Sequence, residues 1–468
     1  MVIKHGLRED KNGWIYISIH GKPKERGFAY GTLIAKEMIE VRRILDFTIY
    51  NDFGVKWEYF IQVAQRDITP VISSQFPEFY DEMVGFAEGA NITIDEVVAW
   101  NNYFTLTDSW WNHMSEKDKI IIYGEDYKNQ PIRTSEGGNK DRCSAFMAVG
   151  DWTADGKIVC AHNTFADFLT GQLGNYVVDI RPTQGNRILL SGYPGWIWSG
   201  TDFSVTSAGI IGTETTIGGF KNYQANIPIS CRIRNAMQYG KNLDDYERML
   251  LDGNSGDYAC TWMFGDTNTN EIMRIELGLR FHNTTRTQNG VFIGYNAPED
   301  PKIRNLECTN TGIDDIRRHQ GARKVRLAEL MDIHKGTINV DIAQQIISDH
   351  YDVYLNKENP CSRTICSHYE LDPREYMSDP SRPKPFEPRG AVDGNVIDTQ
   401  MAKHMSFSLR WGTACGKPFI KDMFCDSQPV WNYMRPYLHD RHSYPWTTFS
   451  ITNLPKKLTR KRRIQTTP

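Results

Sequence analysis

The chain changes character at Cys143. A polar run, SEGGNKDR, occupies Ser135–Arg142 and has no apolar periodicity, which is typical of an exposed loop. Short apolar segments follow the cysteine, and we expect strands over Ala145–Val149, Lys157–Ala161, Tyr176–Ile180 and Arg187–Leu190. Cleavage of the Arg142–Cys143 bond at this loop-to-strand junction would make Cys143 both a nucleophile and a new amino terminus. The alternative is a cysteine that only fills the core, because free cysteine is among the most buried residue types.

Length and charge limit the classes of partner. A chain of 468 residues with 40% hydrophobic and 12% aromatic residues can bury a large core. Its net charge of −3 gives no general attraction to polyanions, so we expect no nucleic-acid partner. One dense basic run, Lys456–Arg463, is either a polyanion-binding signal or a solvated terminus.

No run reaches the ~18 apolar residues of a spanning helix. The amino terminus has no apolar signal-peptide core, so we expect a cytoplasmic protein without an integral membrane segment.

The cysteine pattern does not indicate a metal site. The nine cysteines are an odd number and form no CxxC pairs, which argues against a zinc ribbon or a fully paired disulfide scaffold. Cys361 and Cys366 are close enough in sequence to cross-link in an oxidising compartment. No Gly-rich phosphate loop stands between a strand and a helix pattern. We therefore expect neither a metal nor a cofactor.

The order of the predicted elements indicates a layered α+β fold. A strand at Trp14–Ile19 precedes helical patterns over residues 28–45, 63–79 and 82–100, so the first 142 residues are mostly helical after one strand. Strands dominate from Cys143 to about Tyr295, interrupted by a helical stretch over 232–251. Helices over 324–331 and 341–347 and strands over 405–411 and 446–451 complete the chain. This order predicts two sheets packed between helices.

Several motifs resemble two related families. HGKPKERGFAYGTLIAKEM (20–38), EMVGFAEGANITIDEVVAWN (82–101) and ISDHYDVYLNKENPCSRTIC (347–366) are similar to the acyl-coenzyme A:6-aminopenicillanic acid acyltransferase family. A closer likeness is to the phospholipase B-like proteins. It is carried, in the same order, by CSA at Cys143, AHNTF (161–165), SGYPGWIWSGTDF (191–203), GTETTIG (212–218), DGNSGDYACTWM (252–263) and GAVDGNVIDTQMAKHMS (390–406).

This resemblance implies a fold and a maturation step. Both families are N-terminal nucleophile hydrolases with a four-layer αββα sandwich, so that fold is expected here. The resemblance also implies autocatalytic cleavage before Cys143. A small chain, residues 1–142, would then stay bound to a catalytic chain, residues 143–468. Phospholipase B-like proteins are usually secreted or lysosomal, and in this respect the amino terminus departs from them.

Donors for a tetrahedral oxyanion are the first group of candidate catalytic residues. Asn163 and Asn254 are the candidates, because an asparagine amide can stabilise the oxyanion, but a turn-capping role is open for each. In the phospholipase B-like pattern an Asn pair follows Tyr258, where this chain has Ala259-Cys260. His162 is a candidate for polarising the site or orienting a water, with a hydrogen-bonded core histidine as the alternative.

Substrate and electrostatic roles involve four further residues. Thr215 and Thr216 could place hydroxyls near the new amine. The alternative is that they have no catalytic role, because β-branched residues are common in strands. Trp196, in the aromatic motif at 191–203, is a candidate for substrate binding. Arg304 stands where the acyltransferase relatives have a similar Asn…Pro…Arg stretch, and it either holds the site electrostatically or forms a surface ion pair.

Three functions follow as hypotheses. The first is an autoproteolytically activated cysteine hydrolase that cleaves an acyl amide or ester through a thioacyl-enzyme. The second is acyl transfer to an amine acceptor. The third is an unprocessed lipid- or peptide-binding protein without catalysis. The expected partners are a small-molecule acyl substrate and the chain's own N-terminal fragment, and a homo-oligomer is left open.

Overall fold

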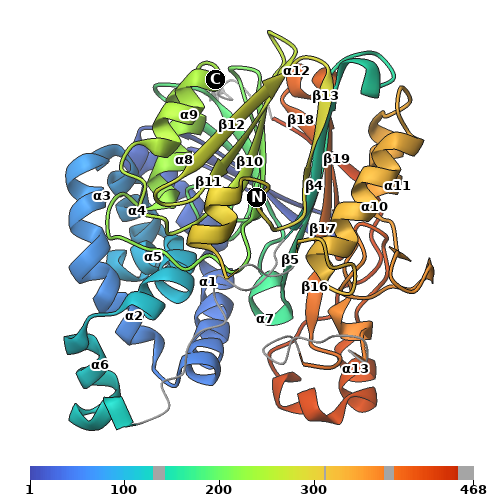
Figure 1. The fold of residues 1–468 in the computed structure, drawn as a ribbon. Coiled ribbons are helices and arrows are strands. Elements are labelled where there is room, and N and C mark those ends of the chain that lie inside the picture. Colours follow the sequence, from blue (N-terminus) through green and yellow to red (C-terminus); the bar gives the residue numbers. More distant parts are fainter. Residues whose placement is uncertain (130–142, 310–312, 374–383, 452–468) are drawn as a thin grey trace, which may run out of the picture.

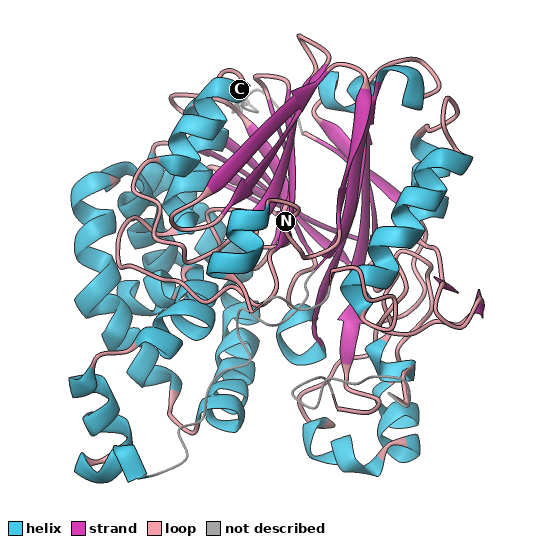
Figure 2. Cartoon of the chain, in the orientation of Figure 1, coloured by secondary structure: helices cyan, strands magenta, loops and turns pink. Residues whose placement is uncertain are grey.

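Two β-sheets lie face to face at the centre of the molecule, and helices cover both outer sides (Figures 1 and 2). The computed structural model describes residues 1–129, 143–309, 313–373 and 384–451. The order of layers is helices, a ten-stranded sheet, a seven-stranded sheet and helices. The αββα sandwich expected from the resemblance is therefore confirmed.

The larger sheet joins three strands from the first 21 residues to seven strands from residues 176–287. Its order is β1-β2-β3-β6-β7-β8-β9-β10-β11-β12. The strands are β1 (Val2–Ile3), β2 (Gly6–Lys11), β3 (Trp14–Gly21), β6 (Tyr176–Pro182), β7 (Ile188–Gly192), β8 (Phe203–Thr206), β9 (Ile210–Thr216), β10 (Cys260–Asp266), β11 (Glu271–Leu277) and β12 (His282–Thr287). Only β3 and β6 pair in parallel, from Ile15 opposite Tyr176 to Gly21 opposite Pro182, and every other neighbouring pair of described strands in this sheet is antiparallel.

The smaller sheet carries the strand that begins at Cys143. Its order is β13-β4-β5-β17-β18-β19, and β16 pairs with β5 off this path. The strands are β4 (Cys143–Val149), β5 (Val159–Asp167), β13 (Gly290–Gly294), β16 (Arg389–Ala391), β17 (Asp393–Asp398), β18 (Ser406–Trp411) and β19 (Thr447–Ser450). A separate two-stranded hairpin is formed by β14 (Tyr351–Asp352) and β15 (Lys357–Glu358). Every residue of β4 is buried, because both faces of the strand are covered.

Helices from the two halves of the chain cover different sheets (Figure 1). On the outer side of the larger sheet lie α1 (Pro23–Phe53), α2 (Trp57–Val63), α3 (Thr69–Gln75), α4 (Pro77–Ala90), α5 (Ile94–Asn101), α8 (Ile229–Tyr239) and α9 (Leu243–Leu251). The smaller sheet is covered by α10 (His319–Ile333) and α11 (Val340–Ile347). The remaining helices are α6 (Glu116–Tyr123), α7 (Phe168–Gly171), α12 (Thr399–Lys403) and α13 (Lys421–Ser427). No helix in the described ranges combines the length and the apolar character that a membrane crossing needs.

Some predicted boundaries were wrong. The first part of the chain has three strands rather than one, because β2 is a mostly polar hairpin partner of β3 and shows no alternation in sequence. The helix expected over 63–79 is divided by Phe76, which precedes the proline that begins α4. The helix expected over 82–100 ends at Ala90, where Asn91 adopts a left-handed conformation with φ of 57°. Local turn chemistry therefore overrode a continuous apolar pattern.

Residues from the first 129 positions pack against the rest of the chain. Beyond the β3–β6 pairing, Glu82 of α4 accepts hydrogen bonds from Arg26 of α1 and Arg234 of α8, each at 2.8 Å. The indole nitrogen of Trp100 donates to the carbonyl of Pro194 at 2.7 Å. The two chains expected from cleavage thus share one sheet and one core. The boundary at residue 142 lies outside the described residues and stays a prediction.

Glycines allow α1 and α4 to approach closely. A Cβ added at Gly31 would lie 2.2 Å from the carbonyl oxygen of Phe86, and one at Gly89 would lie 2.2 Å from that of Phe28. Backbone atoms cannot move aside without separating the helices. We expect Gly31→Ala to lower the free energy of unfolding by about 2–3 kcal/mol. Denaturant midpoints measured beside Lys36→Ala, on the exposed side of α1, check this, and equal midpoints for the two variants would contradict it.

Candidate active site around Cys143

Cys143 is the first residue of β4 and is fully buried. Across the strand pair it faces Thr164 of β5, while Ser144 faces Asn163 and Ala145 faces His162. The strand predicted after Cys143 is confirmed. The polar loop and Arg142 lie outside the described residues.

Acidic groups from the other sheet reach the sulfur. The Sγ atom of Cys143 lies 4.0 Å from Oε1 of Glu214, which belongs to β9. The hydroxyl of Tyr258 lies 3.0 Å from the same Glu214 oxygen and 2.9 Å from Oδ2 of Asp202. All four residues are buried. A single phenol proton can serve only one carboxylate at a time, so Asp202, Tyr258 and Glu214 form a proton-sharing chain that ends at the sulfur.

Asp202 has an unusual backbone conformation, and it also lies close to both Cys143 and Glu214. Asp202 has a φ of 57°, a left-handed backbone conformation that aspartate tolerates better than most residues. The ligand atoms of Cys143, Asp202 and Glu214 all lie within 4.8 Å of one another, which would also suit a cation. Because the Tyr258 hydroxyl bridges the two carboxylates, this arrangement can also move a proton between them.

Asn296 and Arg323 hold the backbone of the nucleophile. Oδ1 of Asn296 accepts the backbone N–H of Cys143 at 3.3 Å and the Nη2 of Arg323 at 2.8 Å. The Nη1 of Arg323, from α10, donates to the carbonyl oxygen of Cys143 and to Oγ of Ser144. The amide of Asn296 donates to the carbonyl of Thr216 at 2.8 Å. Cys143 is therefore fixed on both sides by side chains from other elements.

The structure places Asn163 away from the sulfur. Successive side chains of a strand point to opposite faces, so Ser144 and its partner Asn163 face away from the Cys143 side. The Nδ2 of Asn163 donates to the carbonyls of Ile347 at 3.0 Å and Ile365 at 3.2 Å, and its Oδ1 accepts the N–H of Ser144 at 3.3 Å. With both amide protons engaged, Asn163 orders the backbone next to the nucleophile and is not available as an oxyanion donor in this arrangement.

Asn254 and Arg304 also lie in structural roles here. Asn254 donates to the carbonyl of Gly278 at 2.7 Å and accepts from the N–H of Gly256, which is the turn-capping alternative. Arg304 is in a π-helical turn (Ile303–Glu307) and donates to the carbonyl of Glu299 at 3.3 Å. The buried arginine that contacts the nucleophile is Arg323, which sequence patterns did not indicate.

The three residues predicted to bind substrate are all buried, but each lies in a different environment. Thr216 Oγ1 lies 3.4 Å from both Glu214 Oε1 and Tyr258 Oη, so it belongs to the acidic chain. Thr215 is fully buried and lies next to Gly294 of the smaller sheet. Trp196 stacks on Trp198 with ring centroids 5.0 Å apart. An aromatic cluster connects these rings to the acidic chain: Trp196, Trp198, Phe104 and Tyr258.

His162 is buried in an apolar setting. Neither of its ring nitrogens has a hydrogen-bond partner among the described residues, and its ring lies 6.4 Å from that of Phe203. Burial lowers the pKa of His162 to about 3, because the charged imidazolium would lose its hydration. His162 is thus a neutral histidine in the core. The alternative to a catalytic role was a hydrogen-bonded core histidine, and the burial agrees with it while the hydrogen bond is missing among the described residues.

This histidine predicts a loss of stability in acid. The folded-state pKa lies below the usual value of about 6.5, so the unfolded chain binds the extra proton and stability falls as the pH drops below about 6.5. The cost at pH 5 is about 2 kcal/mol for this group. We expect His162→Leu to show a smaller decrease in Tm between pH 7.5 and pH 5 than the unchanged protein. Equal decreases in the two proteins would contradict this reading of His162.

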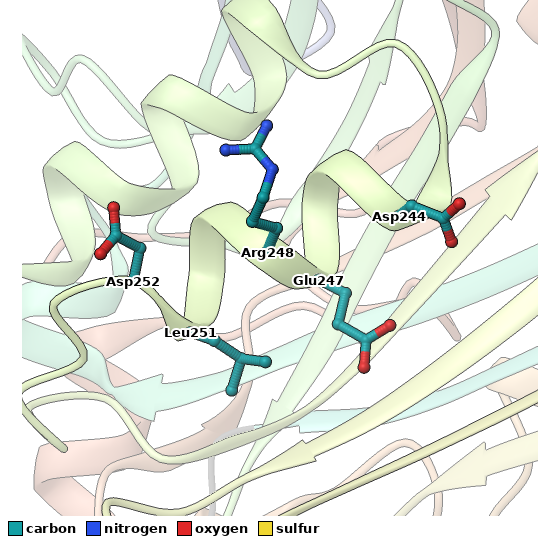
Figure 3. Close-up of a pocket in the computed structure, with 5 residues that line it drawn as sticks. All are labelled: Asp244, Glu247, Arg248, Leu251 and Asp252. Carbon is teal, nitrogen blue, oxygen red and sulfur yellow. The ribbon is translucent and has the colours of Figure 1, made fainter.

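A surface pocket lies away from this site. It is lined by Asp244, Glu247, Arg248, Leu251 and Asp252, on α9 and the residue after it (Figure 3). Two of its carboxylates already bind Arg286 of β12, at 2.6 Å from Asp244 and 3.1 Å from Glu247. The pocket holds none of the residues around Cys143, and we assign it no catalytic role.

The fold is an αββα sandwich, and its candidate site is built around a buried cysteine at the start of a strand. Comparison with known proteins adds a family: residues 81–276 match the Phospholipase B family. The similarity to phospholipase B-like proteins that the motifs indicated is therefore confirmed for this part of the chain.

Three individual relatives are similar over about 150 aligned residues each. Phospholipase B-like 2 of Rattus norvegicus is 30% identical over 147 residues, 26% of this chain and 24% of the relative. Phospholipase B-like 3 of Caenorhabditis elegans is 32% identical over 148 residues, 28% of this chain and 24% of the relative. Phospholipase B-like 2 of Mus musculus is 34% identical over 149 residues, 26% of this chain and 23% of the relative. The matches span about a quarter of the length of these relatives.

Solved structures give a weaker likeness. Penicillin V acylase from Agrobacterium tumefaciens aligns with a TM-score of 0.34 at 12% identity, covering 57% of this chain and 83% of the other. A variant of conjugated bile acid hydrolase from Clostridium perfringens aligns with a TM-score of 0.26 at 11% identity, covering 58% and 84%.

Proposed function

We propose that the protein is an acyl hydrolase whose nucleophile is Cys143, made active by cleavage of the Arg142–Cys143 bond. The observation that carries the proposal is the environment of this one residue. Its nitrogen is held by Asn296, its carbonyl by Arg323, and its sulfur lies 4.0 Å from Glu214. A cysteine that only filled the core would not need side chains from three other elements to fix its main chain and reach its sulfur.

Cleavage would proceed by transfer of the acyl group from nitrogen to sulfur. Glu214 can accept the thiol proton, and the thiolate then attacks the carbonyl carbon of residue 142. The C–N bond breaks, the nitrogen of Cys143 gains a proton, and a thioester to sulfur forms. Water then hydrolyses the thioester, which leaves a carboxylate on residue 142 and restores the thiol. Because Asn296 already binds the nitrogen, the new α-amine would remain next to the sulfur.

Turnover would use the same groups. The neutral α-amine, with a usual pKa of about 7.7–8.0, can take the thiol proton directly or through one water. The thiolate attacks the substrate carbonyl, and the leaving amine or alcohol takes the proton from the ammonium. Water releases the acyl group from the thioacyl-enzyme. The cationic Arg323 near the nucleophile favours the thiolate over the thiol.

The substrate class rests on the relatives and on the surroundings of the site. The names of the phospholipase B-like relatives point to removal of acyl chains from lipids. The aromatic cluster of Trp196, Trp198, Phe104 and Tyr258 is buried and makes the surroundings of the acidic chain apolar, which suits an acyl chain better than a charged group. We therefore propose an acyl amide or ester, with lysophospholipids and N-acyl amines as the first compounds to test.

The mature protein tests this proposal directly. Denaturing gels should show two pieces, and amino-terminal sequencing of the larger one should begin Cys-Ser-Ala-Phe. The two pieces should co-purify under native conditions, because they share the β3–β6 pairing and the Glu82–Arg234 ion pair. The cut protein should release acyl groups from the substrate panel. An uncut chain that hydrolyses nothing in the panel would overturn the proposal.

That last outcome would favour the binding-protein alternative. Its specific support is Ala259-Cys260, which replaces the Asn pair of the phospholipase B-like pattern next to Tyr258. Burial and the neighbouring Glu214 raise the pKa of Cys260 well above its usual value, so this thiol does not replace a lost catalytic group. Acyl transfer is separated from hydrolysis by adding a primary amine and measuring whether the acyl group is captured faster than it is hydrolysed.

A further inference from the structure

Four potential metal ligands from distant parts of the sequence meet beside the smaller sheet. They are His350 before β14, Cys366 and His368 in the following loop, and Cys415 after β18, and their ligand atoms all lie within 4.8 Å of one another. Nε2 of His368 lies 3.6 Å from Sγ of Cys366 and 3.5 Å from Sγ of Cys415. Cys366 and His368 are fully buried, while His350 and Cys415 are partly buried.

These distances fit one tetrahedral ion. Zinc binds cysteine sulfur at about 2.3 Å and histidine nitrogen at about 2.0 Å, which places neighbouring ligand atoms about 3.3–3.8 Å apart at tetrahedral angles. The two measured nitrogen–sulfur distances fall within this interval. Two sulfurs and two imidazole nitrogens are also a donor set that selects zinc over magnesium or calcium, which prefer oxygen.

Both histidines are oriented as metal ligands are. Nδ1 of His368 lies 2.7 Å from Oε1 of Glu370, so its other nitrogen is directed to the two sulfurs. Nδ1 of His350 lies 3.6 Å from Oε1 of Glu358. Nε2 of His350 is buried and has no hydrogen-bond partner among the described residues. A carboxylate hydrogen-bonded to the second nitrogen, as Glu370 is to His368, is the usual second layer of a zinc site, because it fixes the ring and strengthens the ligand. Glu358 is near enough to His350 for an ion pair but not for a hydrogen bond.

We propose that His350, Cys366, His368 and Cys415 bind one Zn²⁺ ion. Four protein ligands leave no open position for water or substrate, so the site is structural rather than catalytic. A disulfide between Cys366 and Cys415 is the competing arrangement. It would use the two sulfurs but would give no reason for two imidazoles, one of them hydrogen-bonded to Glu370, to converge on them.

The ion would stabilise the segment that orders the nucleophile strand. Cys366 directly follows Ile365, whose carbonyl accepts from Asn163, and Asn163 in turn accepts the N–H of Ser144. The backbone N–H of Cys366 also donates to the carbonyl of Asp349 at 3.1 Å, next to His350. Zinc would thus tie residues 349–368 to the turn after β18. This role does not depend on the proposed hydrolase activity.

Metal analysis of the full chain, purified with a thiol reductant and without added chelator, tests the proposal. We expect about one zinc per chain, and X-ray absorption should show two sulfur and two nitrogen neighbours. Removal of the ion with a strong chelator should lower Tm, and added Zn²⁺ should restore it. Co²⁺ in its place should give the thiolate charge-transfer and d–d absorption of a tetrahedral site.

Variants separate the site from general effects on folding. Cys415→Ser should reduce the zinc content to less than about a tenth per chain, while Cys425→Ser, at a buried cysteine in α13 outside the cluster, should leave it unchanged. Glu370→Gln keeps all four ligands and should weaken zinc binding about 10–100-fold. A reduced, folded protein that neither contains zinc nor takes up Zn²⁺ at micromolar concentration would overturn the proposal. A Cys366–Cys415 disulfide found by mass spectrometry in most molecules would do the same.

Discussion

Replacing Cys143 by alanine is expected to leave the chain in one piece and to abolish release of acyl groups. Alanine removes the sulfur that would attack the carbonyl of residue 142 and that would later carry the acyl group. The small change in volume at a fully buried position should cost about 1 kcal/mol of stability or less, so the variant should fold. Intact mass should show only the uncut chain, and turnover of the acyl panel should fall to the background rate.

Two further variants make this result specific. Cys143→Ser keeps a nucleophilic oxygen, which Glu214 and the amine activate less readily than a thiol, so slow cleavage over hours or days is expected. Cys160→Ala is the matched control, because Cys160 is a fully buried cysteine of the neighbouring strand β5, and burial raises its pKa above the range in which thiolates form. It should be cut and active. Normal cutting of Cys143→Ala would mean that an external protease makes the cut.

Replacing Asn296 by alanine should slow both cleavage and turnover about 100-fold. The change removes the oxygen that holds the N–H of Cys143 and Arg323, and it removes the amide bonded to Thr216. A displacement of the nucleophile by about 1 Å is enough for a 100-fold loss of rate. Asn296→Asp keeps the acceptor oxygen and loses only the donor to Thr216, so its loss should be smaller.

The control for Asn296 must share its backbone conformation. Asn296 has a φ of 67°, so alanine also brings strain at this position. Asn270→Ala imposes the same strain at a φ of 56° and loses one amide hydrogen bond, to the carbonyl of Gly156. Asn270 lies in the turn between β10 and β11, at the end of β10 opposite to Cys260. It should lose stability but keep the rate of cleavage. If the two alanine variants slow cleavage equally, Asn296 acts only through the fold.

Part of the site could be predicted from sequence because its signals are local. The change from a polar to an apolar sequence at Cys143, the apolar run of β4 and the motif that contains Thr216 and Glu214 all lie within short segments. The partners of Cys143 could not be found in this way. Arg323 is 180 positions away on a helix and shares no motif with the cysteine. The candidate Arg304 had a motif but lies beside Glu299 instead.

The four proposed zinc ligands show the same limit more clearly. The cysteine spacing predicts no metal site, because no two cysteines show the short spacing of a zinc ribbon. In the fold, Cys366 and Cys415 come together because the loop before β16 and the turn after β18 lie at the same end of the smaller sheet. Spacing rules describe sites built within one motif, and they do not apply to ligands that a sheet brings together.

By itself the sequence determined the layered α+β class, most of the strands and helices, and the position of the candidate nucleophile at the start of a strand. These features depend on apolar periodicity, turn residues and short motifs, which act over a few residues. Tertiary structure alone decided which acids, amides and arginines surround that cysteine and which residues form the second cluster. The physical reason is that hydrogen bonds and metal coordination act over about 3–4 Å in space, whatever the separation along the chain.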